Sequence, residues 1–451
     1  MLMVIIIVTI VTAWIVRRAI AEDPRLSDAQ SRFVISVSEF PGLVREAISE
    51  TRSQIVGDPV LLLMDRKSID RSHWVRRFPA SDDTGYLLLS GVNPEEKQSS
   101  VQLIRISDGA QIAKWSPDWV TLFSLITPKF GYPVGNPKAA QALHPLLLNG
   151  GDIIFNTTTA LVRLGPCGSK PVWLLDEAMH HSIEIDSRIN AIWGPSFSKD
   201  GFADNPWLRD RTFDNALAKV SVDGKVIEKR SFARILRDND LKFFLASPFK
   251  GMIRNNADPM HVNQIQVAQK NTQYWQLGDL LISARNISTI FIYRPSTNKI
   301  IWYKTGPWMS QHSVDFVDDH RISVFDNNVV AEVENNNAFI SPSDTNRVIV
   351  YDFDTNKTSQ PFSELLADAR PVSLFGGRAR LLPDGGLFIE ETQYGRHLRF
   401  TRDRLLWSRI NDFDDKRIGA LSWSRYLTAE EASVPLKALA SHQCSATRLI
   451  Q

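Results

Sequence analysis

The sequence predicts an all-β protein, a six-bladed β-propeller that follows an N-terminal membrane anchor or signal segment. Two repeated patterns support this fold. Six hairpin-like units, each with two alternating apolar runs around a turn of Asp, Asn or Gly, recur about every 60 residues. Four histidines, His144, His181, His261 and His312, each precede an alternating apolar run. Radial repetition of four-stranded units is how propellers build an all-β ring, so we expect these histidines to meet at its axis.

The hairpin units predict antiparallel strands, because their side chains alternate with a period of two on both sides of each turn. They lie at 101–115, 160–173, 216–229, 289–302, 347–360 and 398–407. We expect each hairpin to supply the two outer strands of a blade and the histidine run to supply the inner ones. Four units end in tryptophan, which we interpret as blade packing rather than a ligand platform. These are Trp115, Trp173, Trp302 and Trp407.

The chain divides into four predicted parts. They are a hydrophobic anchor or signal segment at 1–21, a strand and helix extension at 22–80, the propeller at 81–420 and a C-terminal tail at 421–451. Within the extension, alternation predicts a strand at 31–40 and amphipathic spacing predicts a helix at 41–53. Either this extension or the tail after about residue 419 can supply the strand that closes the ring.

The N-terminus is apolar and carries no charged side chain from Met1 to Val16. This run is shorter than the about 20 residues that a membrane-spanning helix needs. Arg17 and Arg18 follow, and then the sequence Ala-Ile-Ala, which has the small-x-small form of a signal cleavage site. We expect an exported protein, membrane-anchored or secreted, in the periplasm or another extracytoplasmic space. A buried helix is the alternative.

The charge balance excludes a dedicated nucleic-acid surface. Lys and Arg number 52 against 50 Asp and Glu, the formal net charge is +2, and no basic patch interleaved with aromatics occurs. The two cysteines, Cys167 and Cys444, lack the spacing of a zinc site. They are either unrelated thiols or, in an oxidising compartment, a disulfide that pins the C-terminal tail.

The segment 258–328 is the richest in groups that can carry chemistry. It contains His261, Asn263, Arg285, Asn286 and His312. Strand alternation places His261 and Asn263 on the same side. Arg285 lies within the apolar run LLISARNIST, where an arginine is costly to bury without an anion. Two imidazoles, an amide and a guanidinium near the axis would together suit a tetrahedral oxyanion.

The remaining units lack a histidine at the repeated place. Arg378 is expected to occupy the equivalent place in the unit around 381–391, and the first unit, around 85–92, has no histidine there.

These motifs resemble those of the bacterial arylsulfate sulfotransferases, also called arylsulfotransferases, a family with a six-bladed propeller fold. The resemblance is best over about 176–330. The matching stretches are His261-x-Asn263 after Asp-Pro, Ser283-x-Arg285-Asn286, Gly306-Pro307 followed by Gln311-His312, Phe325 to Asn327, and the pair His180-His181. The chain departs from the family pattern at Ser182 and Ser313, where an Asp commonly follows the histidines.

The resemblance implies that a sulfuryl group passes from a phenolic sulfate to a phenol. The implied mechanism is ping-pong through a sulfohistidine, with no nucleotide sulfate donor, no cofactor and no metal. The implied partners are small aryl sulfates and phenols. Sulfuryl transfer, like phosphoryl transfer, has a loose transition state in which positioning and electrostatics dominate.

The resemblance also implies a role for each site residue. His312 would be the nucleophile. Arg285 and Asn263 would bind the sulfuryl oxygens, with Asn286 and His180 as further substrate-binding residues. His261 and His181 would stabilise charge or carry the phenol proton; strand register decides whether His181 or His180 faces the site.

Two other function classes fit the histidine repeats. One is a non-catalytic propeller that binds carbohydrate, peptide or a membrane partner, because fold alone does not fix function. The other is an enzyme whose axial histidines hold iron, a metal that imidazole suits, although Arg285 would place a positive charge beside it. Under the first alternative His312 is a structural residue, and His261 and Arg285 form a polar network that closes the channel.

Overall fold

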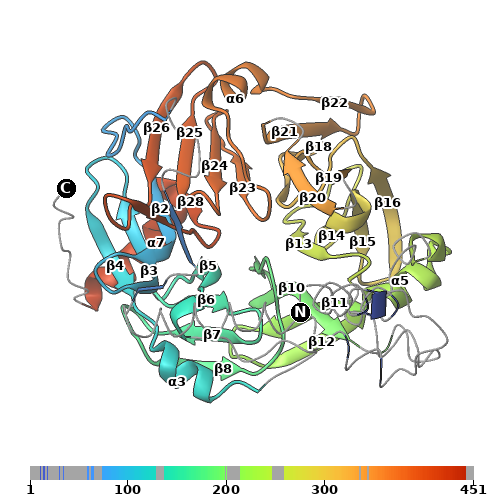
Figure 1. Cartoon of the computed structure of the whole chain (residues 1–451), viewed down its shortest axis with the longest axis horizontal. Coiled ribbons are helices and arrows are strands. Elements are labelled where there is room, and N and C mark those ends of the chain that lie inside the picture. The colour runs from blue at the N-terminus through green and yellow to red at the C-terminus, as the bar shows by residue number, and fades with distance from the viewer. Residues whose placement is uncertain are drawn as a thin grey trace, which may run out of the picture.

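The protein is a six-bladed β-propeller, as the sequence predicts (Figure 1). The described part of the chain forms six four-stranded antiparallel sheets arranged as a ring. This computed structural model describes residues 11, 14, 15, 18, 30, 34, 58–59, 62–65, 74–127, 137–198, 200, 214–245, 258–334, 337–342 and 345–442.

Each blade runs outward from a short innermost strand. Blade 1 is β28 (Arg425–Leu427), β2 (Tyr86–Asn93), β3 (Gln98–Arg105) and β4 (Gln111–Trp115); blade 2 is β5 (Leu143–Leu147), β6 (Ile153–Asn156), β7 (Leu161–Leu164) and β8 (Pro171–Leu175); blade 3 is β9 (Glu184–Asp186), β10 (Ala191–Ser198), β11 (Asp214–Ser221) and β12 (Val226–Ser231). Blade 4 is β13 (Val262–Val267), β14 (Leu280–Ala284), β15 (Thr289–Arg294) and β16 (Lys299–Thr305); blade 5 is β17 (Val314–Phe316), β18 (Arg321–Asp326), β21 (Arg347–Asp352) and β22 (Lys357–Ser359); blade 6 is β23 (Arg378–Leu381), β24 (Leu387–Glu391), β25 (Arg396–Phe400) and β26 (Leu405–Ile410).

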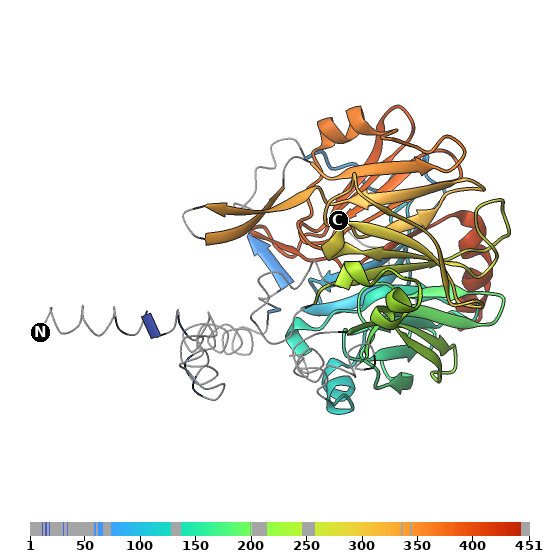
Figure 2. The ribbon, with the colours of Figure 1, turned by 90° about the vertical axis from the view of Figure 1, so that its right-hand side faces the viewer.

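Two small sheets accompany the blades. β1 (Leu63–Asp65) pairs with β27 (Arg417–Gly419), and β19 (Val329–Glu334) pairs with β20 (Asn337–Pro342). The β19–β20 hairpin is inserted between the second and third strands of blade 5 and projects beyond the ring (Figure 2).

All six predicted hairpins are confirmed as the two outer strands of the six blades. For example, the hairpin at 101–115 contributes β3 and β4, which pair with Val101 opposite Trp115. The hairpins are recognisable from sequence because both of their strands are local and separated only by a turn. Trp115 and Trp407 are fully buried, which agrees with their interpretation as packing residues.

The ring is closed by the C-terminal tail. β28 pairs with β2, so blade 1 combines a strand from the end of the propeller with three strands from its beginning. The bond from the Ser90 backbone N–H to the Ser424 hydroxyl, 3.1 Å, reinforces this closure. Of the two predicted sources of the closing strand, the tail supplies it.

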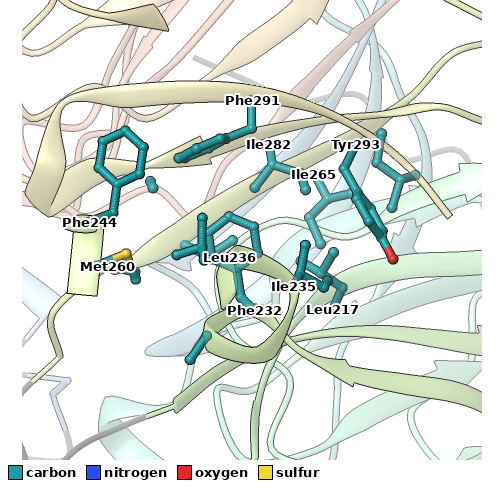
Figure 3. Close-up of a cluster of buried hydrophobic side chains, with 14 of the residues drawn as sticks. Leu217, Phe232, Ile235, Leu236, Phe244, Met260, Ile265, Ile282, Phe291 and Tyr293 are labelled. Atoms are coloured by element: carbon teal, nitrogen blue, oxygen red, sulfur yellow. The ribbon is translucent and has the colours of Figure 1, made fainter. Parts of the chain in front are cut away.

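The hydrophobic core is divided among the interfaces between blades. Six clusters of buried side chains lie in the described residues, one between each pair of neighbouring blades. Both faces of the inner strands are therefore buried, and each large apolar side chain contributes about 1.5–3 kcal/mol. Figure 3 shows the cluster between blades 3 and 4, where Phe232 meets Phe291 edge-on at 5.4 Å and Met260 is packed beside the site described below.

Short helices cover the outside of the ring. They are α3 (Trp119–Ser124), α5 (Phe232–Asp238), α6 (Ser363–Ala369) and α7 (Ala429–Ser441), with the 3₁₀ turns η3 (Pro137–Ala139) and η5 (Lys242–Leu245); a further 3₁₀ turn, η7 (Arg285–Ile287), lies near the axis. α7 begins with a capping box between Thr428 and Glu431. Its Leu439 is buried in the cluster between blades 1 and 2, so the helix anchors the closing strand.

Cys167 is disulfide-bonded and is therefore not a free thiol. The one other cysteine in the sequence is Cys444, which lies outside the described residues.

Among the residues described, no helix is long and apolar enough to span a bilayer. The predicted anchor at 1–21, strand at 31–40 and helix at 41–53 lie outside the described residues, apart from single positions such as Val34, which is helical.

We predict that Leu439→Ala destabilises the propeller by about 2–5 kcal/mol, because it leaves a cavity where α7 locks the closing blade. The measurement is the free energy of unfolding in denaturant. Val434→Ala in the same helix is the matched control, since Val434 is 51% exposed and its loss should cost within about 0.5 kcal/mol. Equal effects of the two changes would show that α7 does not hold the ring closed.

Candidate active site

Each blade contributes one residue, at or shortly before its innermost strand, to a group that surrounds the propeller axis. The six are His144, His181, His261, His312, Gly376 and Trp423, one from each blade. Ring contacts join Trp423 to His144 at 4.7 Å and to His181 at 6.3 Å, and join His181 to His261 at 4.8 Å and to His312 at 6.3 Å. The Gly376 backbone N–H donates to His312 Nε2 at 3.1 Å and completes the circle.

The backbone is left-handed at most of these positions. φ is +50° at His144, +57° at His181, +50° at His261, +61° at Trp423 and +72° at Gly376. Such values are uncommon outside glycine and cost about 1–3 kcal/mol, so they persist only where the surroundings enforce them. At Gly376 a side chain is also excluded by space, since a Cβ would lie 2.7 Å from the Trp423 ring.

This conformation corrects the expected alternation along the strand that follows His261. His261 precedes β13, and the register of β13 shifts between Val262 and Gln264, so a period of two does not relate His261 to Asn263. The Asn263 amide donates to the Gln311 backbone oxygen at 2.8 Å. Asn263 thereby fixes the segment that leads into His312.

Three of the four histidines form the centre of the site. In the described residues, His181, His261 and His312 each offer a ring nitrogen, and these atoms lie within 4.8 Å of one another. His144 is instead stacked on Trp423, with an interplanar angle of 19° and a buried Nδ1 that has no hydrogen-bond partner in the described structure.

Asp258 holds His261. Its carboxylate accepts from His261 Nδ1 at 2.8 Å, from the His261 backbone N–H at 2.9 Å and from the Asn215 amide at 3.0 Å. The nearby imidazole lowers the pKa of Asp258 although burial opposes this, so the carboxylate is charged. Sequence reasoning did not assign Asp258 a role, although it belongs to the Asp-Pro pair before His261 and lies three residues away.

Asn327 holds His312. Its amide N–H groups donate to the backbone oxygens of Ser373 at 2.8 Å and Gly376 at 2.7 Å, so its Oδ1 is left as an acceptor for His312 Nδ1–H at 2.7 Å. A neutral imidazole that donates through Nδ1 carries its lone pair on Nε2. His312 Nε2 therefore keeps its lone pair, and in the described residues it accepts from the Gly376 N–H.

His180 and His181 form a directed pair. His180 stacks on Phe197 at 4.3 Å and donates through Nε2 to the Ser196 backbone oxygen at 3.4 Å. Its Nδ1 is then an acceptor for His181 Nδ1–H at 2.7 Å, which leaves the lone pair of His181 on Nε2. Of the two, His181 faces the axis and His180 orients it.

Burial keeps these imidazoles neutral. It lowers the pKa of His312 to about 3, with the Arg285 charge as the next cause, and the pKa of His180 to about 4. It also lowers the pKa of His181 well below its ordinary value, and the neighbouring histidines act in the same direction. A neutral ring keeps its lone pair, so the site is poised for nucleophilic attack at neutral pH.

Arg285 lies beside His312 but not in the middle of a strand, which corrects the interpretation of LLISARNIST as one strand. β14 ends at Ala284, and Arg285 begins the turn η7. Its Nη1 donates to the Asn286 side chain at 2.9 Å, its Nε is buried without a partner in the described structure, and its guanidinium lies 5.7 Å from the centre of the Phe375 ring. Burial lowers its pKa, so an anion at this place would be strongly favoured.

Asn286 also supports the site from behind. Its amide donates to the Asp258 backbone oxygen at 2.6 Å and its side-chain oxygen accepts from Arg285. Asn286 thus links Asp258, which accepts from His261, to Arg285, which lies beside His312.

An ion cluster forms the next layer along the axis. Glu184 accepts from Arg425 at 3.0 and 3.2 Å, from Gln264 at 3.4 Å and from Arg378 at 3.5 Å. Arg378 is therefore one layer deeper than expected, and Gly376 stands at the level of the histidines. Glu184 and this cluster were not found from sequence, because its members are up to 241 residues apart.

The predicted site residues thus fall into two groups. His312, His261, His181 and Arg285 meet at the axis, and His180, Asn263 and Asn286 lie behind them.

The family model described as Arylsulfotransferase (ASST) matches residues 144–411, which is more than half of the chain and includes every site residue named above except Trp423 and Arg425. This match confirms the resemblance. No curated protein sequence matches this chain.

Among solved structures, similar chains include a protein of unknown function from Bacteroides caccae, with 13% identity over 76% of this chain and 99% of that one and a TM-score of 0.45. Another is the hydrazine synthase of Kuenenia stuttgartiensis, with 9% identity over 74% and 80% of the two chains and a TM-score of 0.39. A third is the Pan2 WD40 domain of Neurospora crassa, with 10% identity over 75% and 79% and a TM-score of 0.36. Likeness at this level carries no argument about function.

We predict that the buried histidines make stability fall in acid. Between pH 6.5 and about 3, unfolded His312 binds a proton that folded His312 does not, so the unfolding free energy falls as pH is lowered through this window. The slope is up to about 1.4 kcal/mol per pH unit for one histidine. His312→Gln should flatten the dependence relative to wild type, and the exposed His442→Gln is the control. An unchanged slope in His312→Gln would mean that His312 is not held neutral.

Proposed function

Because the chain belongs to the arylsulfotransferase (ASST) family, we propose that it moves a sulfuryl group from a phenolic sulfate ester to a phenol through a covalent intermediate on His312. The observation that carries the proposal is the state of this histidine. Its Nδ1–H donates to Asn327, its Nε2 keeps the lone pair, and the half-buried Arg285, which has no carboxylate hydrogen bond in the described residues, lies beside it.

In the first half-reaction, His312 Nε2 attacks sulfur and the bond from sulfur to the phenolic oxygen breaks. The sulfated ring gains positive charge, which the bond to Asn327 Oδ1 stabilises. The lone pair that accepted from the Gly376 N–H now forms the N–S bond, so this N–H becomes free to donate to a sulfuryl oxygen. Arg285 neutralises the sulfuryl charge.

His261 carries the proton in both half-reactions. As an imidazolium paired with Asp258, it gives a proton to the leaving phenolate. In the second half-reaction its Nε2 takes the proton of the acceptor phenol, whose oxygen attacks sulfur while the N–S bond to His312 breaks. Protons and charge balance over the cycle. His181 Nε2 faces the same space and assists in orienting the phenol.

Asn263 keeps its predicted role at the sulfuryl oxygens as part of this proposal. In the structure its amide donates to the Gln311 backbone oxygen at 2.8 Å, and the proposal assigns the second N–H of this amide to a sulfuryl oxygen. His180 and Asn286 act through His181 and Arg285.

We also propose that the enzyme works outside the cytoplasm, tethered by the apolar segment 1–21. Two observations support this location: the uncharged run from Met1 to Val16 and the disulfide-bonded Cys167, because disulfides persist in oxidising compartments. Protease treatment of cells whose outer membrane has been opened and whose inner membrane is intact tests it, because only a protein outside the cytoplasm would be digested.

We predict a covalent sulfuryl adduct on His312. Brief mixing with 4-nitrophenyl sulfate should add the mass of one SO3 group, and peptide mapping under non-acidic conditions should place it on the His312 peptide. His312→Ala should lose the adduct and at least about 10³-fold of the transfer rate. His320→Ala, at a surface turn, should retain both. A folded protein that gains no mass with several donors would favour the non-catalytic binding module.

Arg285 provides the second prediction. Arg285→Met removes the charge that faces the developing sulfuryl oxygens and should lower kcat by about 10²–10³-fold. Arg285→Lys keeps the charge without the planar fork, so it should recover only part of the rate. The measurement is steady-state transfer from 4-nitrophenyl sulfate to phenol. If only KM rises in Arg285→Met, the arginine binds the ground state and the transition state equally and does not accelerate the chemical step.

A further inference from the structure

We infer that His181, His261 and His312 form a site for a divalent ion of the zinc type, and that this ion competes with the phenolic sulfate for the same space. The metal binding stands on the geometry alone; only the competition rests on the proposed function. The site would make the enzyme sensitive to free Zn²⁺ or Cu²⁺.

The three ring nitrogens are already gathered. They lie within 4.8 Å of one another in the described residues, and a zinc ion with Zn–N bonds of about 2.0–2.1 Å would draw them slightly closer. Three protein ligands leave the fourth position open, as in zinc sites that bind water or a ligand.

The three histidines also have the tautomer that leaves one ring nitrogen free to bind a metal. Each of the three rings donates through Nδ1 to a neighbour: His261 to Asp258, His312 to Asn327 and His181 to His180. All three lone pairs are therefore on Nε2. A second partner that fixes the ring and its tautomer accompanies almost every metal-binding histidine, and a carboxylate there raises the basicity of the ligand.

The surrounding charges decide how the ion is held. The Asp258 carboxylate accepts from His261 Nδ1 at 2.8 Å, so an acidic group lies directly behind one of the three ligands. Arg285 opposes a cation, so we expect reversible binding rather than a permanent cofactor. The fourth axial histidine, His144, is stacked on Trp423 and does not belong to the group of three in the described residues.

Metal and sulfate ester need the same lone pair. The Gly376 N–H must leave His312 Nε2 before that atom can bind an ion, and the same change precedes attack on sulfur. One molecule of enzyme therefore holds either the ion or the sulfuryl group.

A second histidine-containing group provides the control. His320 Nε2 lies 3.8 Å from Asp352 and 3.9 Å from Asp354 at the turns of blade 5, and the three are grouped closely enough for an ion. In this group His320 and Asp352 are half-buried and Asp354 is exposed, and Asp352 already accepts from the Thr355 N–H at 3.0 Å. The experiment must therefore distinguish metal bound at this surface group from metal bound at the axis.

The test is titration of the full-length protein with Co²⁺ followed by its visible absorption, and with Zn²⁺ by calorimetry. We expect one tight equivalent that is lost in His181→Ala and retained in His320→Ala. Asp258→Asn should weaken binding about 10–100-fold, because it removes the second partner of His261. Loss of the bound equivalent in His320→Ala but not in His181→Ala, or no binding in wild type, would overturn the inference.

Kinetics separate this inference from the proposed function. Zn²⁺ should raise the apparent KM for 4-nitrophenyl sulfate and leave kcat unchanged, and a chelator should reverse the effect. Bound metal at the axis without any transfer activity in metal-free protein would count against the proposed function alone. Full transfer activity with no metal binding would count against this inference alone.

Discussion

The ion cluster around Glu184 is the constraint on which the axis of this propeller depends. Glu184 belongs to blade 3, Arg378 to the opposite blade 6 and Arg425 to the closing blade 1, and all three meet where the inner strands converge. Burial lowers the pKa of Arg425 to about 10, which still leaves it charged at neutral pH. Removal of one partner from such a cluster costs about 3–5 kcal/mol, so the pairing fixes how the three blades are set against one another.

Burial also determines the properties of the axial histidines, which lie in the layer next to this ion cluster. With the ion cluster beneath them and the blade cores on either side, His181 and His312 are shielded from water, and this burial lowers the pKa of both imidazoles. The orientation of His181, His261 and His312 is then set by one partner each, His180, Asp258 and Asn327, rather than by solvent. The left-handed backbone at His261 is tolerated because its buried neighbours Met260 and Val262 hold the chain on both sides.

Sequence reasoning succeeded where the signal is local and failed where it depends on distant partners. The six hairpins were predicted because two strands and a turn lie within about 15 residues. The convergence of histidines followed from their repeated place. Arg285 was placed inside a strand because apolar residues continue on both sides of it, whereas the chain in fact turns there. Trp423 was missed at the axis, since the tail that carries it closes the ring only in three dimensions.

The departures at Ser182 and Ser313 have a structural explanation. The Ser182 hydroxyl accepts from the Ile265 backbone N–H at 3.1 Å, and the Ser313 hydroxyl donates to the Ala379 backbone oxygen at 3.2 Å. Each serine therefore ties its inner strand to the next blade. An aspartate after these histidines is not needed to orient His181 or His312, because His180 and Asn327 already do so from other positions. The arrangement at the axis thus retains directed imidazoles although the chain lacks the family's acidic residues at 182 and 313, because orientation depends on where an acceptor lies in space and not on which residue follows the histidine.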